Sequence, residues 1–79
     1  MEVKDHVHTI TADNSKSLNE WLKKNHDKEK SIWLIIYKKN SGVPSVTYSE
    51  AVDEALCFGW IDGKPNKRDR ESYYQFFAK

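Results

Sequence analysis

The stretch that decides the fold is Ile-Trp-Leu-Ile-Ile-Tyr at residues 32–37, an unbroken apolar run between Ser31 and Lys38. It is rich in β-branched and aromatic residues, and its length is that of a strand. Since consecutive strand residues point to opposite faces of a sheet, a run without polar alternation needs cover on both faces. The run therefore predicts the central strand of the fold.

A helix is predicted before this strand. Asp13 or Asn14 can cap its first turn. Apolar residues with helical spacing then define one buried face: Leu18, Trp21 and Leu22. The helix is expected to stop near His26, a residue that the negative end of the helix dipole favours.

A second helix is predicted after the strand, beyond a loop that contains Gly42 and Pro44. Thr47 and Glu50 have the spacing of a capping box, in which each side chain accepts a hydrogen bond from the other residue's backbone N–H. Gly59 lies where a left-handed C-cap is favoured. The core-facing stripe of this helix is expected to consist of Tyr48, Val52, Ala55 and Leu56.

Three further segments have strand character. Val7–Ile10 is expected to be an edge strand, Trp60–Asp62 a short extended piece ended by Gly63, and Ser72–Phe77 a strand after a charged loop at residues 64–71. The element order β-α-β-α-β-β predicts an α+β fold in which a small, mainly antiparallel sheet packs with two helices. We expect a single domain over residues 1–79, with a folded core at about residues 7–77.

Composition excludes several classes of protein. The 79 residues include 13 basic and 12 acidic side chains, so the net charge is +1 and no overall field attracts nucleic acid or an anionic membrane. Cys57 has no partner for an internal disulfide, which suits a reducing cytoplasm. Met1–Thr11 lacks the apolar segment of a signal peptide, and no apolar run approaches the roughly 20 residues of a membrane span. We expect a soluble, cytoplasmic domain without membrane insertion.

The order of these motifs resembles a known family. Residues 50–63 read Glu-Ala-Val-Asp-Glu-Ala-Leu-Cys-Phe-Gly-Trp-Ile-Asp-Gly, and residues 41–48 before them read Ser-Gly-Val-Pro-Ser-Val-Thr-Tyr. Over residues 10–77 the chain resembles the core domain of the YdeI/OmpD-associated family, also labelled bacteriocin-protection proteins, without that family's basic C-terminal extension. It departs from the family in the loop before the last strand. The resemblance implies no reaction, catalytic residue or cofactor, because the family label records association and protection.

A ligand site is predicted from five residues: Tyr37, Lys38, Lys39, Trp60 and Asp62. If Trp60–Asp62 is a strand, the indole and the carboxylate share one face and can form the floor and the polar handle of a binding site. The alternative is that Trp60 fills the core and Asp62 turns the chain with Gly63. Lys38 and Lys39 lead toward the N-terminus of the second helix, where backbone N–H groups and the helix dipole attract anions.

Two further sets of residues are weighed as chemical sites. Cys57 lies near a helix C-terminus beside two acidic residues, where a thiolate is disfavoured, so we expect a buried structural thiol. His6 and His8, with His26 or Cys57, have no spacing that demands zinc, and a solvated histidine pair is expected. We therefore predict no metal and no cofactor.

The leading hypothesis is a small binding or interaction module, not an enzyme, whose partner is a small anionic ligand or another protein. One alternative is an enzyme-like small-molecule site that uses Cys57 or Asp62. The other alternative is a nucleic-acid-binding module. Its basic and aromatic residues would be Lys38, Lys39, Lys64, Lys67, Arg68, Arg70, Tyr73 and Tyr74.

Charge and aromatic content rank these partners. Glu50, Asp53 and Glu54 offset much of the basic cluster, which makes nucleic acid the less favoured partner. A protein partner would be indicated by an exposed aromatic patch around Tyr73, Phe76 and Phe77. A small anionic ligand or a protein is therefore expected before nucleic acid.

Overall fold

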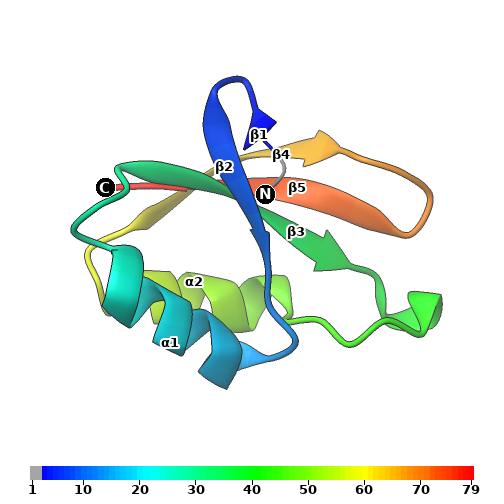
Figure 1. Cartoon of the computed structure of the whole chain (residues 1–79). Helices are drawn as coiled ribbons and strands as arrows, with labels where there is room; N and C mark the ends of the chain where they lie inside the picture. The colour runs from blue at the N-terminus through cyan, green and yellow to red at the C-terminus, as the bar shows by residue number, and fades with distance from the viewer. Residues whose placement is uncertain (1–2) are drawn as a thin grey trace.

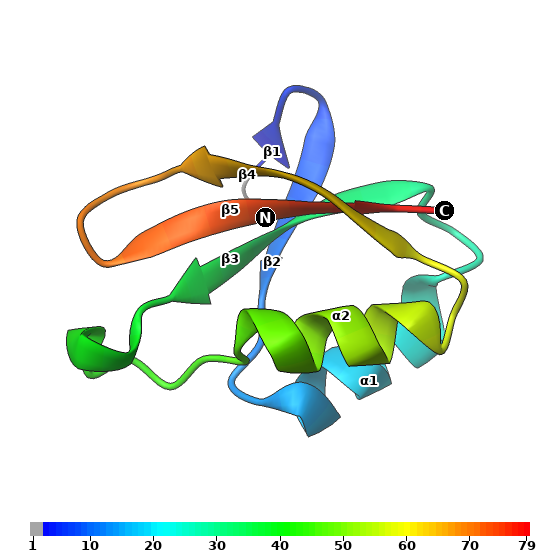
Figure 2. The same cartoon turned by 180° about the vertical axis from the view of Figure 1, so that it is seen from behind.

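A five-stranded sheet carries both helices on the same face (Figure 1; Figure 2). This computed structural model describes residues 3–79. Met1 and Glu2, which belong to the predicted domain and to the segment predicted not to be a signal peptide, lie outside the described residues. The elements in chain order are β1 (Val3–Lys4), β2 (Val7–Thr11), α1 (Ser15–Asn25), β3 (Ser31–Tyr37), the 3-10 turn η1 (Lys39–Ser41), α2 (Tyr48–Leu56), β4 (Ile61–Lys67) and β5 (Ser72–Ala78). The predicted α+β fold is confirmed, with β1 as a short strand in front of the predicted order.

The strand order β1-β2-β3-β5-β4 places β3 in the middle of the sheet, as predicted. β3 pairs with β5 in antiparallel register along its whole length, from Ser31 opposite Ala78 to Tyr37 opposite Ser72. β2 runs parallel to β3, because α1 crosses between them on one face of the sheet. The pairs β1–β2 and β4–β5 are antiparallel, so the sheet is mainly antiparallel.

The prediction that β3 is covered on both faces is confirmed. Residues 32–36 are all buried. Ile32, Leu34 and Ile36 belong to the core beneath the helices. Trp33 and Ile35 alternate with them and face the other way, yet they are only 7% and 4% exposed.

The face opposite the helices is covered by the sheet itself. The sheet curls, and the β1–β2 hairpin projects to the side away from α1 and α2 (Figure 2). Trp33 packs on this side against Phe76, with ring centroids 4.9 Å apart, and against the edge of Tyr74 at 6.0 Å. The Lys4 ammonium lies 5.3 Å from the centroid of the Trp33 ring and adds a cation–π contact. A second, aromatic cluster therefore backs the main core.

The first helix forms as its sequence pattern predicts. The side chain of Asn14 accepts a hydrogen bond of 2.9 Å from the Ser17 backbone N–H, which caps the helix. Leu18 and Leu22 are buried against the sheet, and Trp21 is packed against the same core. His26 is the C-cap residue, as predicted, and its N–H donates to the Leu22 carbonyl at 2.8 Å.

The second helix begins as predicted, but its buried stripe differs from the expectation. Both hydrogen bonds of the Thr47–Glu50 capping box are present. The buried residues are Ala51 and Ala55, whereas Tyr48 and Leu56 are 42% and 57% exposed. Leu56 follows Ala55 by about 100° of helix rotation, so a stripe centred on the two alanines turns Leu56 outward. Small side chains at the contact let α2 lie close to the sheet, and the expectation that Tyr48 and Leu56 face the core was wrong.

The segment after α2 also differs from the expectation. Gly59 has the predicted positive φ of 78°. β4 extends through Lys67, into residues that were expected to form a loop, with an irregular register between Asp62 and Pro65. A proline is tolerated there because β4 is an edge strand whose outer N–H groups need no partner. Gly63 is required at the irregularity, because a Cβ would lie 2.9 Å from Cδ2 of Phe76.

The helices are short and amphipathic. Across residues 3–79, neither of them is both long enough and apolar enough to cross a membrane. Each contributes one buried face to the core and leaves polar side chains outside. The candidate site lies at the end of the sheet where β3 ends and β5 begins.

Candidate functional site

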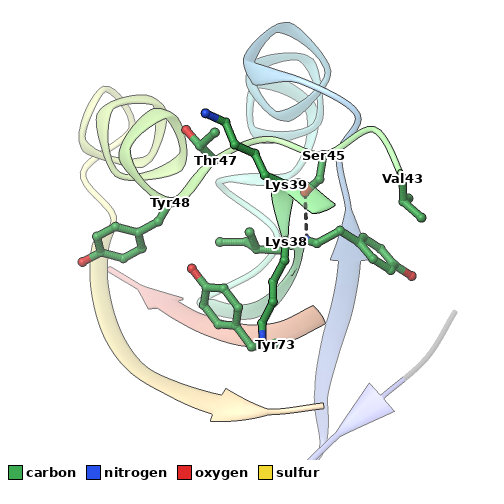
Figure 3. Close-up of a pocket in the computed structure, with 9 residues that line it drawn as sticks. Lys38, Lys39, Val43, Ser45, Thr47, Tyr48 and Tyr73 are labelled. Atoms are coloured by element: carbon green, nitrogen blue, oxygen red, sulfur yellow. Dashed lines mark hydrogen bonds between the residues drawn. The ribbon is translucent and has the colours of Figure 1, made fainter. Parts of the chain in front are cut away.

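A pocket of about 350 Å³ lies where β3 ends, beneath the loop that leads to α2 (Figure 3). The end of β3, the η1 turn, the start of α2 and the start of β5 all contribute to its wall. The lining residues are Ile36, Tyr37, Lys38, Lys39, Val43, Ser45, Thr47, Tyr48 and Tyr73. The pocket thus combines an apolar and aromatic lining with two lysines.

The loop over the pocket is held by hydrogen bonds at both ends. The Ser45 hydroxyl accepts from the Tyr37 backbone N–H at 3.0 Å, which ties the end of the loop back to the end of β3. The Lys38 N–H donates to the Glu71 carbonyl at 2.7 Å, which ties the start of the loop to the β4–β5 turn. Val46 is fully buried, and its N–H donates to the Ala12 carbonyl at 3.0 Å. The loop is therefore anchored to three other segments and presents a defined shape.

Lys38 and Lys39 extend in different directions from the rim of the pocket. Lys38 has an extended backbone, with φ of −70° and ψ of 154°, so its side chain and that of the next residue leave opposite sides of the chain. Figure 3 shows Lys38 extending toward the side of Tyr73 and Lys39 toward the side of Thr47. Both side chains are exposed, and neither takes part in an ion pair with any residue in the described part of the chain.

Tyr73 supplies a neutral phenol at the base of the pocket. It pairs in register with Ile36 on the helix-covered face of the sheet. The ordinary pKa of a tyrosine hydroxyl, 10.0, already keeps the group protonated at neutral pH, and partial burial raises the pKa of Tyr73 further, so the hydroxyl can donate a hydrogen bond. Figure 3 shows this hydroxyl pointing toward the space beside Tyr48, and within residues 3–79 no protein group bonds to it.

Tyr48 forms a side wall whose position Asp62 controls. The Tyr48 hydroxyl donates a hydrogen bond of 2.5 Å to the Asp62 carboxylate on β4. This hydrogen bond, with partial burial and the charge of Asp62, raises the pKa of Tyr48. Asp62 therefore affects the pocket through the orientation of the Tyr48 ring, not by lining it.

The N-terminus of α2 already has an anionic partner. The Glu50 carboxylate accepts hydrogen bonds from the Thr47 N–H at 3.0 Å and from the Thr47 hydroxyl at 3.1 Å. The Glu50 N–H in turn donates to the Thr47 hydroxyl oxygen at 3.2 Å. Because this capping box occupies donors that an anion would use, the two lysines and Tyr73 carry the positive and hydrogen-bonding character of the pocket.

Comparison with known proteins identifies a family for this fold and pocket. The family model described as Domain of unknown function (DUF8412) matches residues 10–79. The chain belongs to the DUF8412 family. No curated protein and no solved structure matches the chain. The matched residues include every residue that lines the pocket, so the pocket is part of the DUF8412 domain.

The pocket brings together three of the five predicted ligand residues of this DUF8412 domain, namely Tyr37, Lys38 and Lys39. Trp60 is fully buried in the core and does not line the pocket. After the positive φ of Gly59, the Trp60 N–H donates to the Ala55 carbonyl at 2.9 Å, which turns the indole beneath α2. The alternative interpretation, in which Trp60 fills the core, is therefore the one that the structure bears out.

Several pocket residues escaped the sequence analysis. Tyr48 was expected in the core, and Tyr73 was considered for nucleic-acid binding or an aromatic patch. What places them together is the β3–β5 register, which sets Tyr73 opposite Ile36, and the approach of α2 to that end of the sheet. The alternation of side chains along Ser72–Ala78 predicts that Tyr73 and Phe77 lie on the same face of the strand. It does not predict which strand pairs with Ser72–Ala78.

The expectation for Cys57 was wrong, because the thiol is exposed. Cys57 is the C-cap of α2 and follows the buried Ala55 by two positions, so it points away from the core. It also lies outside the pocket lining. The DUF8412 domain therefore does not use Cys57 as a packing residue.

The histidines occupy three separate places. His6 lies in the turn between β1 and β2 with a positive φ of 65°. His8 Nδ1 lies 2.6 Å from the Glu29 carboxylate, and His26 packs its ring against Phe58 at 5.1 Å. Over the described range 3–79, no cluster of three or more His, Cys, Asp or Glu side chains is suited to hold a metal ion.

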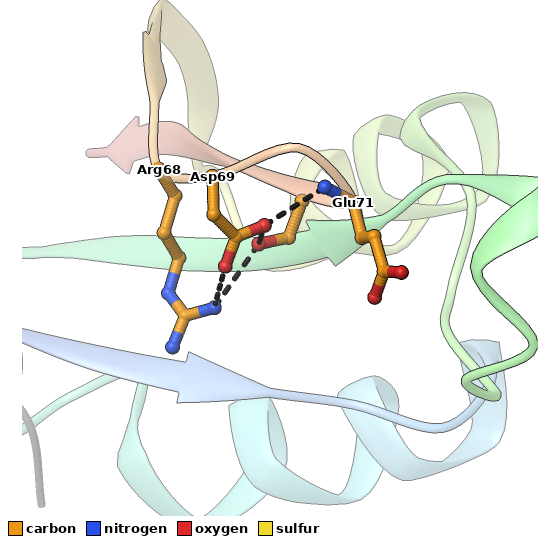
Figure 4. Close-up of polar contacts among 4 residues, drawn as sticks. Arg68, Asp69 and Glu71 are labelled. Carbon is orange, nitrogen blue, oxygen red and sulfur yellow. Dashed lines mark hydrogen bonds and ion pairs between the residues drawn. The ribbon is translucent and has the colours of Figure 1, made fainter.

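Among the aromatic residues considered for nucleic acid or a protein partner, Tyr73 and Phe77 lie on the helix-covered face of the sheet, whereas Tyr74 and Phe76 lie on the other face. Arg68 pairs with Asp69 at 3.0 Å and donates to the Ser72 hydroxyl at 3.0 Å (Figure 4). Phe77 is buried beneath the helices, whereas Phe76 packs on Trp33 on the other face of the sheet. Tyr73, Phe76 and Phe77 therefore do not form the exposed aromatic patch that would have indicated a protein partner.

Proposed function

We propose that this DUF8412 domain is a small binding module that takes a small anionic ligand in the pocket between β3 and α2. The observation that carries the proposal is the joint presence of two lysines without ion pairs and a protonated Tyr73 hydroxyl around one pocket. Cations and neutral hydroxyl donors are the groups that recognise carboxylates and phosphates.

The rest of the pocket supports an organic ligand over a bare inorganic ion. Ile36 and Val43 supply apolar contact, and the Tyr48 ring supplies a planar wall. Small-molecule sites typically combine such apolar lining with a few polar groups that orient the ligand. Since the lysines are exposed and each ion pair with an exposed lysine contributes little, we expect dissociation constants of about 0.1–1 mM for simple probes.

Binding is favoured over catalysis by the placement of the two residues that an enzyme would use. Cys57 is exposed outside the pocket. The Asp62 carboxylate accepts the hydrogen bond of Tyr48 and so acts within the wall. Neither residue has direct access to a molecule in the pocket, and we propose no reaction.

Two further expectations remain proposals. The resemblance to the YdeI/OmpD-associated family is supported by residues 50–63, among which Ala51, Ala55 and Trp60 join α2 to the core. A cytoplasmic setting is supported by the absence of any second cysteine that could pair with Cys57. The first would be tested by a solved structure of that family, in which α2 and Trp60 should occupy the same places.

The binding proposal is tested by titrating the ¹⁵N-labelled domain with benzoate and with inorganic phosphate at constant ionic strength, while amide chemical shifts are recorded. We expect benzoate to shift a contiguous group of amides at residues 36–48 and at Tyr73. Shifts scattered over the surface, or no shifts at millimolar concentrations, would reject the pocket as a binding site.

A pair of double variants provides the matched control. Lys38→Gln with Lys39→Gln removes two positive charges from the pocket and should abolish the benzoate shifts. Lys23→Gln with Lys24→Gln removes the same charge from two adjacent exposed lysines in the last turn of α1, outside the pocket, and should leave them unchanged. Circular dichroism and thermal unfolding of both variants establish that the fold is retained.

A further inference from the structure

The two pocket lysines are arranged for two anionic groups, not one. Lys38 and Lys39 are adjacent in the chain, but their side chains leave opposite sides of it. A single carboxylate or phosphate that contacts both ammonium groups would require the two side chains to turn toward one another. Two separated cations instead match two separated anions.

Each lysine is accompanied by a different hydrogen-bonding environment. Lys38 extends toward the backbone end of the Tyr73 side chain, whereas the Tyr73 hydroxyl points toward Tyr48. Lys39 extends toward Thr47, whose N–H and hydroxyl donate to the Glu50 carboxylate, so the Lys39 ammonium itself is the group that would attract an anion there. The side chains of Ile36 and Val43 and the ring of Tyr48 line the same pocket. The lining thus contains both charged and apolar groups.

We infer that the ligand of this pocket is an organic dianion whose two anionic groups, carboxylates above all, are separated by an apolar or planar body. The inference rests on the proposed function and specifies the ligand class of that same site. One anionic group would contact the Lys38 ammonium, and the other would contact the Lys39 ammonium. The body would lie against Ile36, Val43 and Tyr48.

The test compares terephthalate with its monomethyl ester, which has the same ring and one charge fewer. Both are titrated into the ¹⁵N-labelled domain near neutral pH at constant ionic strength. We expect terephthalate to bind about fivefold more tightly, because the second carboxylate gains an ion pair with an exposed lysine. Its titration should also shift the amides of both Lys38 and Lys39.

Single variants decide whether two sites of charge are involved. Lys38→Gln and Lys39→Gln each leave one lysine in the pocket. In both variants, terephthalate should bind at most about twofold more tightly than the ester, because either of its two carboxylates can contact the remaining lysine. Lys64→Gln is the matched control and should retain the full preference.

The outcomes separate this inference from the proposal beneath it. If both probes bind in the pocket with equal affinity, the dianion inference is overturned while the anion-binding proposal stands. The dianion inference is likewise overturned if one lysine variant abolishes binding and the other has no effect. If neither probe binds and benzoate also fails, the proposed function falls and this inference falls with it.

Discussion

Two loops at the same end of the sheet treat their charged residues in opposite ways. In the β4–β5 turn, Asp69 accepts hydrogen bonds from the Ser72 hydroxyl at 2.8 Å and from the Glu71 N–H at 2.9 Å, and it pairs with Arg68 (Figure 4). In the β3–α2 loop, Lys38 and Lys39 have no ion pair within residues 3–79. The first loop uses its charges to hold its own shape, whereas the second leaves its charges available to a ligand.

The two loops are also physically joined. The Lys38 N–H donates to the Glu71 carbonyl, so the structured turn supports the start of the pocket loop. The backbone of the pocket loop is anchored by this bond and by Ser45, while its lysine side chains remain exposed. An anchored backbone with unpaired charges is the arrangement expected of a binding site. Because the loop is already ordered, ligand binding does not have to lower its conformational entropy.

The largest difference between the loops should appear when their serine hydroxyls are removed. Ser72 is 1% exposed and bonds to both Asp69 and Arg68, so Ser72→Ala should lower the free energy of unfolding by about 1–2 kcal/mol. Ser41→Ala removes a more exposed hydroxyl that accepts from the Val43 N–H and should change it by less than about 0.5 kcal/mol. Urea unfolding at neutral pH measures both. Equal losses would show that the two loops do not differ in this way.

Acid should act on the β4–β5 turn next. The hydrogen bond from the Ser72 hydroxyl, the Glu71 N–H and the charge of Arg68 hold the pKa of Asp69 below its ordinary value of 3.8. A lowered carboxyl pKa stabilises the fold above the unfolded pKa, and this contribution is lost as the pH falls through the folded pKa. Urea unfolding of the wild-type domain and of Asp69→Asn should therefore differ at neutral pH and converge in strong acid. Glu71→Gln is the control, and a difference that persists in strong acid would contradict this account.

A smaller effect is expected at the phenols of the pocket. Since the Tyr73 hydroxyl makes no hydrogen bond within residues 3–79, Tyr73→Phe should change the free energy of unfolding by less than about 0.5 kcal/mol. It should weaken benzoate binding about threefold, because a donor to the carboxylate is lost. Tyr48→Phe is the comparison, since its hydroxyl is directed to Asp62 and its loss should alter benzoate affinity less. Titration of each ¹⁵N-labelled variant with benzoate measures both affinities.

The smallest effect should come from the lysines themselves. Lys38→Gln with Lys39→Gln should change the free energy of unfolding by less than about 0.5 kcal/mol, because exposed residues without ion pairs contribute little to stability. Lys64→Gln with Lys67→Gln should behave alike. A clear loss of stability in the pocket variant alone would show that its lysines support the fold, and would weaken the case for a ligand.

The elements of the fold were accessible from local patterns. The apolar run at residues 32–37, the capping box at Thr47 and Glu50, and the positive φ at Gly59 each depend on short-range chemistry, and all three are present in the structure. The core side of α2 was predicted less well. Tyr48 and Leu56 fit a helical period as well as Ala51 does, and hydrophobicity favoured the larger residues.

The candidate site was predicted in part. Tyr37, Lys38 and Lys39 follow one another at the end of β3, so a prediction from neighbouring residues placed them together. Tyr48 and Tyr73 come from elements farther along the chain, and Trp60 was assigned to the site from a strand that begins one residue later than expected. Trp60 lies in the turn before β4, where packing beneath α2 buries its side chain, and the sequence around it does not show how deep that burial is.

The sequence by itself determined the central strand, the caps of both helices and the α+β order, because these follow from periodicity, backbone preference and hydrogen bonds within a few residues. The tertiary structure alone decided that Tyr73 and Tyr48 meet two lysines in one pocket, that Cys57 is exposed and that Trp60 is buried. These outcomes depend on strand register and on how closely α2 approaches the sheet. Both are set by packing between segments distant in the chain, which no local pattern records.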